Sequence, residues 1–344
     1  MALSRGNLLK SDLDEVLYTV DSFEEFRNSK ILILGGTGFV GTWLVSSLLH
    51  ANEYFDLNLS INIITRNIKS AQNKLSLNQN DPIIFMESDL KDSTLVFESP
   101  FDYYVHAATP SLIVTGSNDP EMVSAASLGG AELISRSILK FQNSPSVIHT
   151  SSGAVYGKQS FDEANKLEVS LCKSLVLNND YAKTKRATEE FLNDFSVNST
   201  ARISNPRLYA FAGPRIELNE HFAIGNFVRD GISGREINVK GNPSTLRSYL
   251  YPTESTSWLI KLMASPSTEN LNIGSEVKYS MYELATLVSD LTNKKGVLFE
   301  NQDAEASIYV PSTKNTQKIL KVKERVSLEN GLERWIRWLE LIKK

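Results

Sequence analysis

Short apolar runs alternate along the chain with longer stretches in which apolar residues recur at helical spacing. The first run, at 31–34, is too short for a helix and ends at a glycine, which is typical of a buried parallel strand. Later runs predict further strands over residues 59–65, 82–86, 101–106, 146–150 and 201–209. Helical spacing predicts helices over residues 39–49, 120–141 and 181–195. This alternation predicts βαβ units, and therefore an α/β fold with a Rossmann-like, doubly wound parallel sheet.

An N-terminal extension precedes the first predicted strand. Within residues 1–29, Leu13, Val16 and Leu17 stand at the i, i+3, i+4 spacing of a short amphipathic helix. We expect this helix to pack on the surface of the domain that follows. The alternative is a segment that binds a partner.

The character of the sequence changes near residue 213. Residues 30–212 carry the alternation and are predicted to form a dinucleotide-binding domain. Beyond them, glycines and a proline punctuate short segments, and helical spacing returns at 253–264 and 280–293. We expect residues 213–344 to form mainly a smaller, mixed substrate-binding lobe, with some return to the first domain. Because open α/β sheets bind ligands at the carboxyl ends of their strands, this lobe is expected to close a substrate site there.

Composition disfavours several classes of protein. The 344 residues are 41% hydrophobic and 22% charged, as in ordinary globular proteins, and the net charge of -4 comes without a basic block, which argues against nucleic acid as a partner. The single cysteine, Cys172, excludes an internal disulfide, and with only four histidines we expect no metal site. The chain has no export signal and no run of about 18 apolar residues, so we expect a cytoplasmic protein without membrane spans.

A glycine-rich turn directly follows the first predicted strand. Its sequence, Gly-Gly-Thr-Gly-Phe-Val-Gly at 35–41, opens a predicted helix. Glycine lets a pyrophosphate approach the backbone, and the N–H groups and positive dipole end of a helix favour an anion. A tight structural turn also needs glycines, but the position between strand and helix favours dinucleotide binding. The predicted cofactor contacts in this turn are Gly35, Thr37, Gly38, Phe39, Val40 and Gly41.

The end of the second predicted strand indicates which dinucleotide binds. NAD sites commonly place an acidic residue there for the ribose 2′-hydroxyl, whereas this chain has Thr65, Arg66 and Asn67. Arg66 can stack on adenine and pair with a 2′-phosphate, with hydrogen bonds added by its two neighbours. Alternatively, Arg66 is a solvated surface residue. The absence of an acid favours NADP over NAD as the cofactor.

A tyrosine and a lysine are spaced for proton transfer. Tyr181 and Lys185 lie four residues apart, on one face of the predicted helix. A phenol has a reference pKa of about 10, and a neighbouring ammonium together with a bound nicotinamide cation is expected to lower that pKa. Ser152 follows the strand at 146–150, where it can hydrogen-bond a substrate oxygen beside the tyrosine. Each motif alone also arises by chance or in structural turns, but their order favours a catalytic set of Ser152, Tyr181 and Lys185.

With these motifs, residues 30–340 resemble the extended short-chain dehydrogenase/reductase family, in its branch of nucleotide-sugar epimerases, dehydratases and reductases. The resemblance includes the glycine-rich turn, the Ser152 strand and the Tyr181 helix. It extends to the segments at 88–90, 105–108, 207–215, 247–251 and 271–274. The family pairs through two long helices, here 120–141 and 181–195, so the resemblance implies a homodimer.

The resemblance implies roles for further residues. Asp89 would bond the adenine amine with Leu90 packed nearby, and the small residues Ala107 and Ala108 would line the cofactor. The remaining implied cofactor contacts are Thr109, Tyr181, Lys185 and Leu208. The implied substrate contacts are Ser111, Ser152, Ala210, Asn226 and Arg247. Of these, Arg247 would pair with a substrate pyrophosphate, because guanidinium geometry suits phosphate oxygens.

Departures from the family pattern narrow the implied chemistry. Family dehydratases carry an acidic pair directly after the catalytic hydroxyl residue, where this chain has Gly153 and Ala154, so dehydration is disfavoured. A related decarboxylase pattern keeps a glutamate at the Ala154 position, so decarboxylation is disfavoured as well. Ala210 replaces a frequent substrate-contacting asparagine, and Ala126 replaces an asparagine of the long helix. These two changes imply a different sugar pose and a different proton relay.

The favoured function is a nucleotide-sugar reductase that reduces a keto group, with C4 as the preferred position, by hydride from NADPH. Tyr181 would give the proton, Ser152 would orient the carbonyl, and Lys185 would hold the cofactor. The alternative is a 4-epimerase with tightly bound NAD, which needs nearly the same residues. A more distant alternative, a non-catalytic dinucleotide-binding or redox-sensing protein, is disfavoured by the intact set of three.

Overall fold

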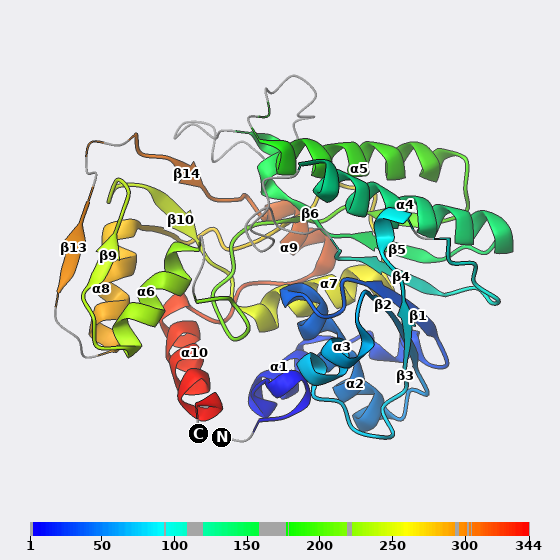
Figure 1. Cartoon of the computed structure of the whole chain (residues 1–344), viewed down its shortest axis with the longest axis horizontal. Helices are drawn as coiled ribbons and strands as arrows, with labels where there is room; N and C mark the ends of the chain where they lie inside the picture. Colours follow the sequence, from blue (N-terminus) through cyan, green and yellow to red (C-terminus); the bar gives the residue numbers. More distant parts are fainter. Residues whose placement is uncertain are drawn as a thin grey trace. The chain divides into compact units, whose positions relative to one another are not determined.

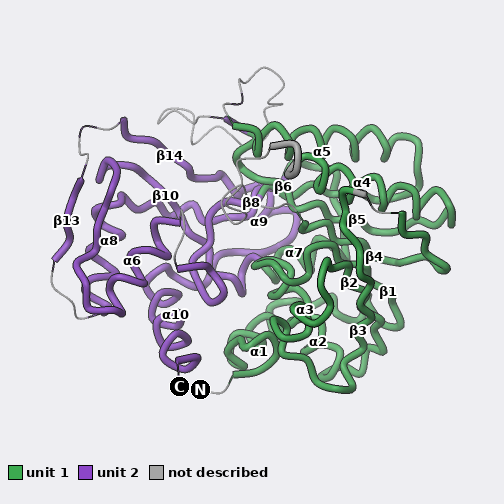
Figure 2. Tube along the Cα trace, viewed as in Figure 1, with its two compact units in different colours: residues 1–155, 179–207, 256–270 green, residues 156–178, 208–255, 271–344 purple. Residues whose placement is uncertain are grey.

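A computed structural model describes residues 3–92, 94–108, 120–157, 177, 179–218, 222–292, 296–300, 303 and 305–343. The chain divides into two compact units (Figure 2). Unit 1 consists of Met1–Val155, Asn179–Arg207 and Thr256–Asn270, and unit 2 consists of Tyr156–Asn178, Leu208–Ser255 and Leu271–Lys344. Each unit is therefore built from segments that lie far apart in the sequence.

Unit 1 contains a parallel sheet of six strands in the order β3-β2-β1-β4-β5-β7 (Figure 1). The strands are β1 Lys30–Leu34, β2 Ser60–Thr65, β3 Ile83–Glu87, β4 Tyr103–His106, β5 Ser146–His149 and β7 Arg202–Ser204. Leu34 pairs with Ile64 of β2 on one side and with His106 of β4 on the other. The strand order reverses between β1 and β4, and such switch points are where doubly wound sheets bind ligands.

Helices cover both faces of this sheet (Figure 1). The helices of unit 1 are α1 Lys10–Thr19, α2 Phe39–Phe55, α3 Ile68–Leu75, α4 Pro120–Phe141, α5 Asp180–Val197, and the part of α7 Pro252–Ala264 that begins at residue 256. Leu32 of β1 belongs to one buried cluster with Ile134 of α4 and Leu192 of α5. Because side chains alternate along a strand, its neighbours Ile31 and Ile33 face the opposite layer. Both are fully buried there, as a parallel strand covered on two sides requires.

The predicted helix of the N-terminal segment is confirmed as α1. Two short 3-10 helices flank it, η1 Arg5–Asn7 and η2 Phe23–Phe26. Leu8 and Leu13 pack with Trp43 of α2 in a buried cluster. The Phe26 ring centroid lies 4.7 Å from that of Tyr103 in β4. The segment thus contributes buried side chains to unit 1.

Unit 2 mixes short strands with helices. Its helices are α6 Ala223–Ile232, α8 Met281–Leu291, α9 Lys314–Leu320 and α10 Leu328–Ile342. Its strands are β9 Ile237–Val239, β10 Leu246–Ser248, β11 Asn272–Ile273, β12 Lys278–Ser280, β13 Val297–Phe299 and β14 Ile308–Tyr309. Strands β10, β12 and β14 form a three-stranded sheet in the order β12-β10-β14, and β9 pairs with β13. None of the helices described in either unit has both the length and the apolar character of a membrane span.

The single strand predicted at 201–209 is wrong, because the structure divides it into β7 and a short strand β8 Arg207–Leu208. Asn205 and Pro206 interrupt it. Proline has no N–H to donate to a ladder and restricts the residue before it. The Pro206 carbonyl oxygen instead accepts a hydrogen bond of 2.9 Å from the Ser151 N–H. Ser151 begins the short strand β6 Ser151–Ser152, which follows β5 and leads into the 3-10 helix η4 Gly153–Tyr156.

Candidate active site

The turn after β1 contains three glycines whose positions tolerate no side chain. Gly35 has a φ of +83°, and a Cβ there would lie 2.6 Å from the backbone of Ala107. A Cβ on Gly41 would lie 2.1 Å from the Gly35 carbonyl oxygen, and one on Gly36 would lie 2.9 Å from the Ile63 side chain. These three glycines are therefore required by the close packing of the turn, whatever the turn binds.

Gly38 differs from the other glycines of the turn. It is exposed, has a φ of -75°, and among the described residues a Cβ there would meet only the Gly35 carbonyl oxygen, at an ordinary distance of 3.4 Å. Gly38 is also the N-cap of α2, and no side chain caps that helix. A larger residue would place its side chain at the N-terminus of α2, where N–H groups and the positive dipole end point outward. This open helix end fits the pyrophosphate of a dinucleotide.

The end of β2 presents an exposed arginine. Arg66 is exposed directly after the strand. The next residue, Asn67, is the N-cap of α3, and its Oδ1 accepts a hydrogen bond of 2.8 Å from the Ser70 N–H. Asn67 was expected to add a hydrogen bond to the dinucleotide, and its side-chain oxygen already caps a helix. Arg66 is the cationic group that this end of the strand offers to a ligand.

Two further segments that were predicted to contact the cofactor follow β3 and β4. Asp89 is exposed, and its Oδ1 accepts a hydrogen bond of 3.1 Å from the Lys91 N–H at the start of η3 Leu90–Asp92. Leu90 is half-buried against the cluster that includes α4. Ala107 and Ala108 are half-buried directly after β4. Their backbone atoms lie where they would clash with a side chain at Gly35.

Three consecutive residues after β5 are each bonded by one side chain of α5. The pairs are Ser152 with Tyr181, Thr150 with Lys185, and Ser151 with Glu189. In the first pair the two hydroxyls are hydrogen-bonded, in the second the ammonium donates to a backbone carbonyl oxygen, and in the third the serine hydroxyl donates to the carboxylate. The three α5 residues are spaced by four, so they lie along one face of the helix.

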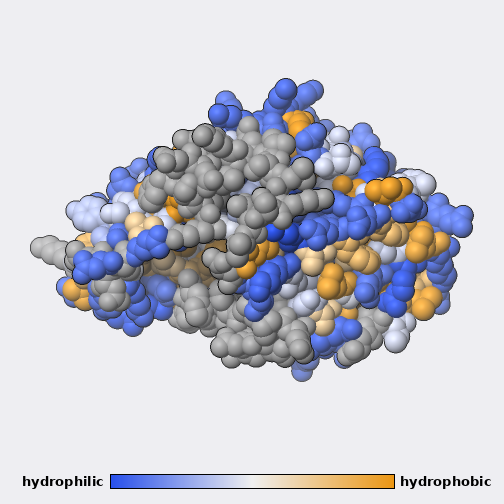
Figure 3. Space-filling model, turned by 90° about the horizontal axis from the view of Figure 1, so that it is seen from above, coloured by the Kyte–Doolittle hydropathy of each residue, from blue (hydrophilic) through white to orange (hydrophobic). Residues whose placement is uncertain are grey.

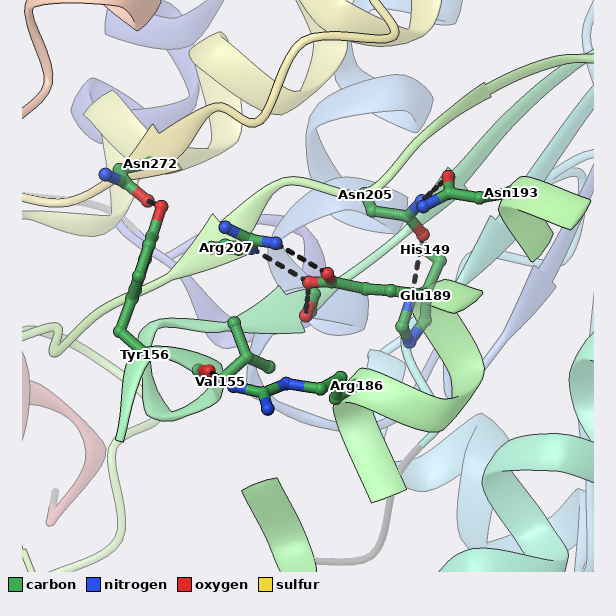
Figure 4. Close-up of polar contacts among 10 residues, drawn as sticks. His149, Val155, Tyr156, Arg186, Glu189, Asn193, Asn205, Arg207 and Asn272 are labelled. Carbon is green, nitrogen blue, oxygen red and sulfur yellow. Dashed lines mark hydrogen bonds and ion pairs between the residues drawn. The ribbon is translucent and has the colours of Figure 1, made fainter. Parts of the chain in front are cut away.

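The start of α5 is set by a side-chain cap. Asn179 accepts a hydrogen bond of 2.7 Å from the Ala182 N–H, which places Tyr181 in the first turn of the helix. One turn later, the Arg186 guanidinium donates to the carbonyl oxygen of Val155 in η4 (Figure 4). The turn that contains Ser152 is therefore held to α5 on both sides of that residue.

Burial dominates the protonation of both predicted acid–base groups. Lys185 is 3% exposed, its Nζ lies 5.9 Å from the centroid of the Tyr181 ring, and burial lowers its pKa to about 7. Burial raises the pKa of the Tyr181 phenol above its ordinary value, while the Ser152 hydrogen bond acts to lower it. The sequence argument expected a lowered pKa for Tyr181. That expectation included a bound nicotinamide cation; without the cation, desolvation of the phenolate outweighs the Ser152 hydrogen bond.

A buried ion pair lies on the same helix face. Arg207 Nε and Nη2 donate to the two carboxylate oxygens of Glu189 at 3.0 Å and 2.8 Å (Figure 4). The two side chains are 7% and 5% exposed. Sequence reasoning did not single out this pair. The signal was a glutamate four residues beyond Lys185, which the helical spacing places on the same helix face as Tyr181 and Lys185.

Two buried histidines stand near this network and carry no charge. The His106 and His149 ring centroids are 5.4 Å apart. His106 Nε2 bonds the Ser127 carbonyl oxygen at 2.7 Å, and His149 Nδ1 bonds Asn205 Oδ1 at 2.9 Å (Figure 4). Burial lowers the pKa of His106 to about 4 and that of His149 well below its ordinary value. Both rings are neutral at physiological pH, so they add no positive charge near Lys185.

The remaining predicted contacts, with cofactor or substrate, fall in two places. Thr109 and Ser111 lie outside the described residues. Unit 2 holds Leu208, Ala210, Asn226 and Arg247. Arg247 in β10 is half-buried, and its Nη2 donates a hydrogen bond of 3.0 Å to Ser307 Oγ. Asn226 in α6 accepts a hydrogen bond of 3.0 Å from Arg229 Nη1.

Comparison with known families and proteins gives a consistent result. A model of the NAD dependent epimerase/dehydratase family matches residues 31–274. UDP-glucuronic acid decarboxylase 3 of Arabidopsis thaliana is 24% identical over 319 residues, which cover 89% of this chain and 87% of that protein.

Solved structures of similar fold include two epimerases. The UDP-N-acetylglucosamine 4-epimerase from Methanobrevibacter ruminantium M1 matches with a TM-score of 0.78 at 18% identity, over 92% of this chain and 99% of that one. The UDP-glucuronic acid 4-epimerase from Bacillus cereus, in complex with UDP-glucuronic acid and NAD, matches with a TM-score of 0.76 at 19% identity, over 91% and 99%. At these identities the likeness shows the fold, and it confirms the Rossmann-like α/β class predicted from sequence.

Proposed function

The chain belongs to the NAD dependent epimerase/dehydratase family, and from that premise we propose that it moves hydride between a nicotinamide dinucleotide and an oxygen-bearing carbon of a nucleotide sugar. The observation that carries the proposal is the hydrogen bond between Ser152 and Tyr181, with Lys185 one helical turn away. When bound, the nicotinamide supplies or takes the hydride. The chain's own residues handle the oxygen and its proton.

Tyr181 is the proposed proton carrier. Its phenol is protonated at neutral pH because burial raises its pKa, so it can give a proton to a keto oxygen. The Ser152 hydroxyl, bonded to the same phenol, orients that oxygen. When the carbinol is oxidised instead, the proton returns to Tyr181, and the ammonium of Lys185 favours the phenolate that accepts it. One pair of hydroxyls thus serves both directions of the reaction.

The glycine turn is the proposed cofactor site. The open N-terminus of α2 at Gly38 would hold the pyrophosphate, with Thr37, Phe39 and Val40 around it. Ala107 and Ala108 would line the cofactor, because small residues there leave room beside the turn. Asp89 and Leu90 would border the adenine. The donors and the open backbone of this turn suit a dinucleotide without any side-chain charge in the turn itself.

Epimerisation at C4 with a retained NAD is the first candidate reaction. The two solved relatives described above are named 4-epimerases, and one of them is a complex with NAD. Net reduction of a 4-keto nucleotide sugar by NADPH is the second candidate. It is favoured by the exposed Arg66 at the end of β2, where an NAD site commonly has an acid.

Decarboxylation is not proposed, although several curated relatives are named UDP-glucuronic acid decarboxylases. The decarboxylase pattern of the family has a glutamate at the position where this chain has Ala154. The Ala154 N–H donates a hydrogen bond of 3.1 Å to Ser152 Oγ, so the backbone at this position orients the serine. The methyl group of alanine cannot move a proton.

A homodimer through α4 and α5 is proposed as the assembly. Leu139 of α4 is 60% exposed, and Val197 of α5 is 81% exposed. The face seen from above in Figure 3 carries hydrophobic residues among hydrophilic ones. Leu139→Glu is expected to give monomers in light scattering where the wild type gives dimers. An unchanged mass for the variant would remove this surface from the assembly.

The cofactor in freshly purified protein separates the candidate reactions. Heat release and mass spectrometry should yield about one NAD per chain for an epimerase, and little for a reductase that exchanges NADPH. Purified protein is then incubated with UDP-hexoses and with 4-keto nucleotide sugars. An epimerase gives a mixture of C4 epimers without net change in cofactor absorbance, whereas a reductase consumes NADPH. Loss of either activity in Tyr181→Phe supports the assignment, and turnover with neither class of substrate contradicts the proposal.

A further inference from the structure

The ion pair between Glu189 and Arg207 needs an explanation other than stability. Both side chains are almost fully buried, and both carboxylate oxygens are bonded by the guanidinium. Taking two charges out of water is costly, and well-packed apolar residues in place of a buried ion pair are often as stabilising. A bidentate pair does, however, hold two chain segments at a defined distance and angle.

The ion pair also contacts the turn formed by Ser151 and Ser152. Ser151 Oγ donates to Glu189 Oε1, the same oxygen that accepts from Arg207 Nε. The Ser151 N–H also donates to the carbonyl oxygen of Pro206, the residue before Arg207. Ser151 is therefore bonded by its side chain to the ion pair and by its backbone to the residue beside it. Ser152 is the next residue, so its backbone has little freedom to shift.

We propose that Glu189 and Arg207 are positioning residues, which hold the Ser151–Ser152 turn against α5 and so set the Ser152 hydroxyl beside the Tyr181 phenol. The inference rests on the proposed function, in which those two hydroxyls act on one substrate oxygen. Neither positioning residue touches that oxygen. They act through Ser151 on one side and through the α5 backbone on the other.

Charge supports the same arrangement. The Glu189 carboxylate acts to raise the pKa of Lys185, which burial lowers to about 7. Among the described residues, the charged group hydrogen-bonded to this carboxylate is Arg207, and the neighbouring rings of His106 and His149 are neutral at physiological pH. Removing the carboxylate therefore changes the charge near the catalytic lysine as well as the position of the turn.

The test compares three changes with a matched control. Ser151→Ala removes only the link between the ion pair and the turn. Glu189→Gln removes the carboxylate charge, and Glu189→Met combined with Arg207→Met removes both charges while keeping an apolar volume. Glu190→Gln, on the exposed neighbour in the same helix, is the control. Two readouts are used: kcat separately from KM, and the pKa of Tyr181 from NMR of isotope-labelled tyrosine.

The proposal expects kcat to fall about 10- to 100-fold in Ser151→Ala and in the double variant, with KM little changed, because a small misplacement of catalytic groups has effects of this size. The pKa of Tyr181 should rise by about one unit as the Ser152 hydrogen bond is lost. Glu190→Gln should match the wild type in both readouts.

Two results would overturn the proposal. The first is a folded Met double variant with wild-type kcat, because the pair would then serve only to neutralise its own charges. The second is Ser151→Ala with unchanged kcat and unchanged Tyr181 pKa, and this variant does not disturb the ion pair. The NMR readout needs no substrate. A failure of the proposed enzymatic function therefore leaves the positioning of Ser152 by Glu189 testable by itself.

Discussion

The Lys185 ammonium lies 5.9 Å from the centroid of the Tyr181 ring while it donates a hydrogen bond to the Thr150 carbonyl oxygen. The lysine is thus anchored to the end of β5 and brings its charge close to the phenol. Because burial lowers the pKa of Lys185 to about 7, the charge beside Tyr181 changes within the physiological pH range. The site therefore combines a fixed geometry with a protonation state that is easily changed.

Burial of Lys185 predicts a pH-dependent effect on stability. Its pKa is about 7 in the folded protein against a reference of 10.5, so between these values the unfolded chain binds more protons. This group then makes the free energy of unfolding rise with pH, by at most ~1.4 kcal/mol per pH unit. Lys185→Met loses this dependence. The variant should exceed the wild type in stability most strongly below pH 7, and the difference should shrink as pH approaches 10.5.

Urea unfolding across this pH window measures the difference. Lys183→Met is the control, because Lys183 is exposed on the same helix and pairs only with Asp180 among the contacts described at its ammonium. The control should keep the wild-type slope. A Lys185→Met variant with that same slope would show that Lys185 remains charged in the folded protein.

Tyr181→Phe tests the proton carrier. The variant keeps the ring but loses the hydroxyl that bonds Ser152, so turnover should fall by about 10²- to 10⁴-fold while dinucleotide affinity stays within a factor of about two. Steady-state kinetics and fluorescence titration with cofactor measure the two quantities. Tyr54→Phe, at an exposed position of α2, should behave as the wild type. Normal turnover in Tyr181→Phe would assign the proton to another group.

Two glycines of the same turn are expected to respond in opposite ways. Gly41→Ala places a Cβ 2.1 Å from the Gly35 carbonyl oxygen, so it should destabilise the fold by about 1–3 kcal/mol. Gly38→Ala meets only an ordinary contact and should change stability by less than ~0.5 kcal/mol. Its methyl group would instead lie where the pyrophosphate is proposed to bind, and the affinity for NAD should fall at least about tenfold.

Thermal unfolding and calorimetric titration distinguish the two glycine variants. If Gly38→Ala binds NAD as the wild type does, the pyrophosphate does not approach the N-terminus of α2 at this residue.

Arg66→Asp tests the choice of dinucleotide. A carboxylate at this exposed position repels a 2′-phosphate and accepts hydrogen bonds from a 2′-hydroxyl. The affinity for NADP should therefore fall at least about tenfold, while that for NAD holds or improves. Competitive titration with the two dinucleotides measures the ratio. An equal loss for both would remove the argument for a 2′-phosphate site, and would leave epimerisation with NAD as the better-supported reaction.

Local sequence patterns predicted the elements of unit 1 well. The apolar run at 31–34 became β1 Lys30–Leu34, and the predicted helix at 120–141 became α4 Pro120–Phe141. Such patterns work because a strand covered on two faces and a helix covered on one have different apolar periods. The single strand predicted at 201–209 is interrupted at Pro206. Proline has no N–H to donate to a neighbouring strand, so the apolar residues on both sides of it do not form one continuous strand.

Proton affinities could not be predicted in the same way. The spacing of Tyr181 and Lys185 correctly placed both on one helix face, but it could not show that burial raises the pKa of the phenol. Desolvation decides that direction, and it depends on how many groups from other segments surround the phenol. The roles of these residues in catalysis stay predictions.

By itself, the sequence determined the alternation of strands and helices, the glycine turn between β1 and α2, and the shared helix face of Tyr181 and Lys185. Each of these depends on residues within a few positions of one another. Only the tertiary structure brought Ser151, Glu189 and Arg207 into contact and buried Lys185 beside Thr150. These contacts join three separate segments of the chain, and the burial that sets their charges exists only once the sheet and its helices have packed together.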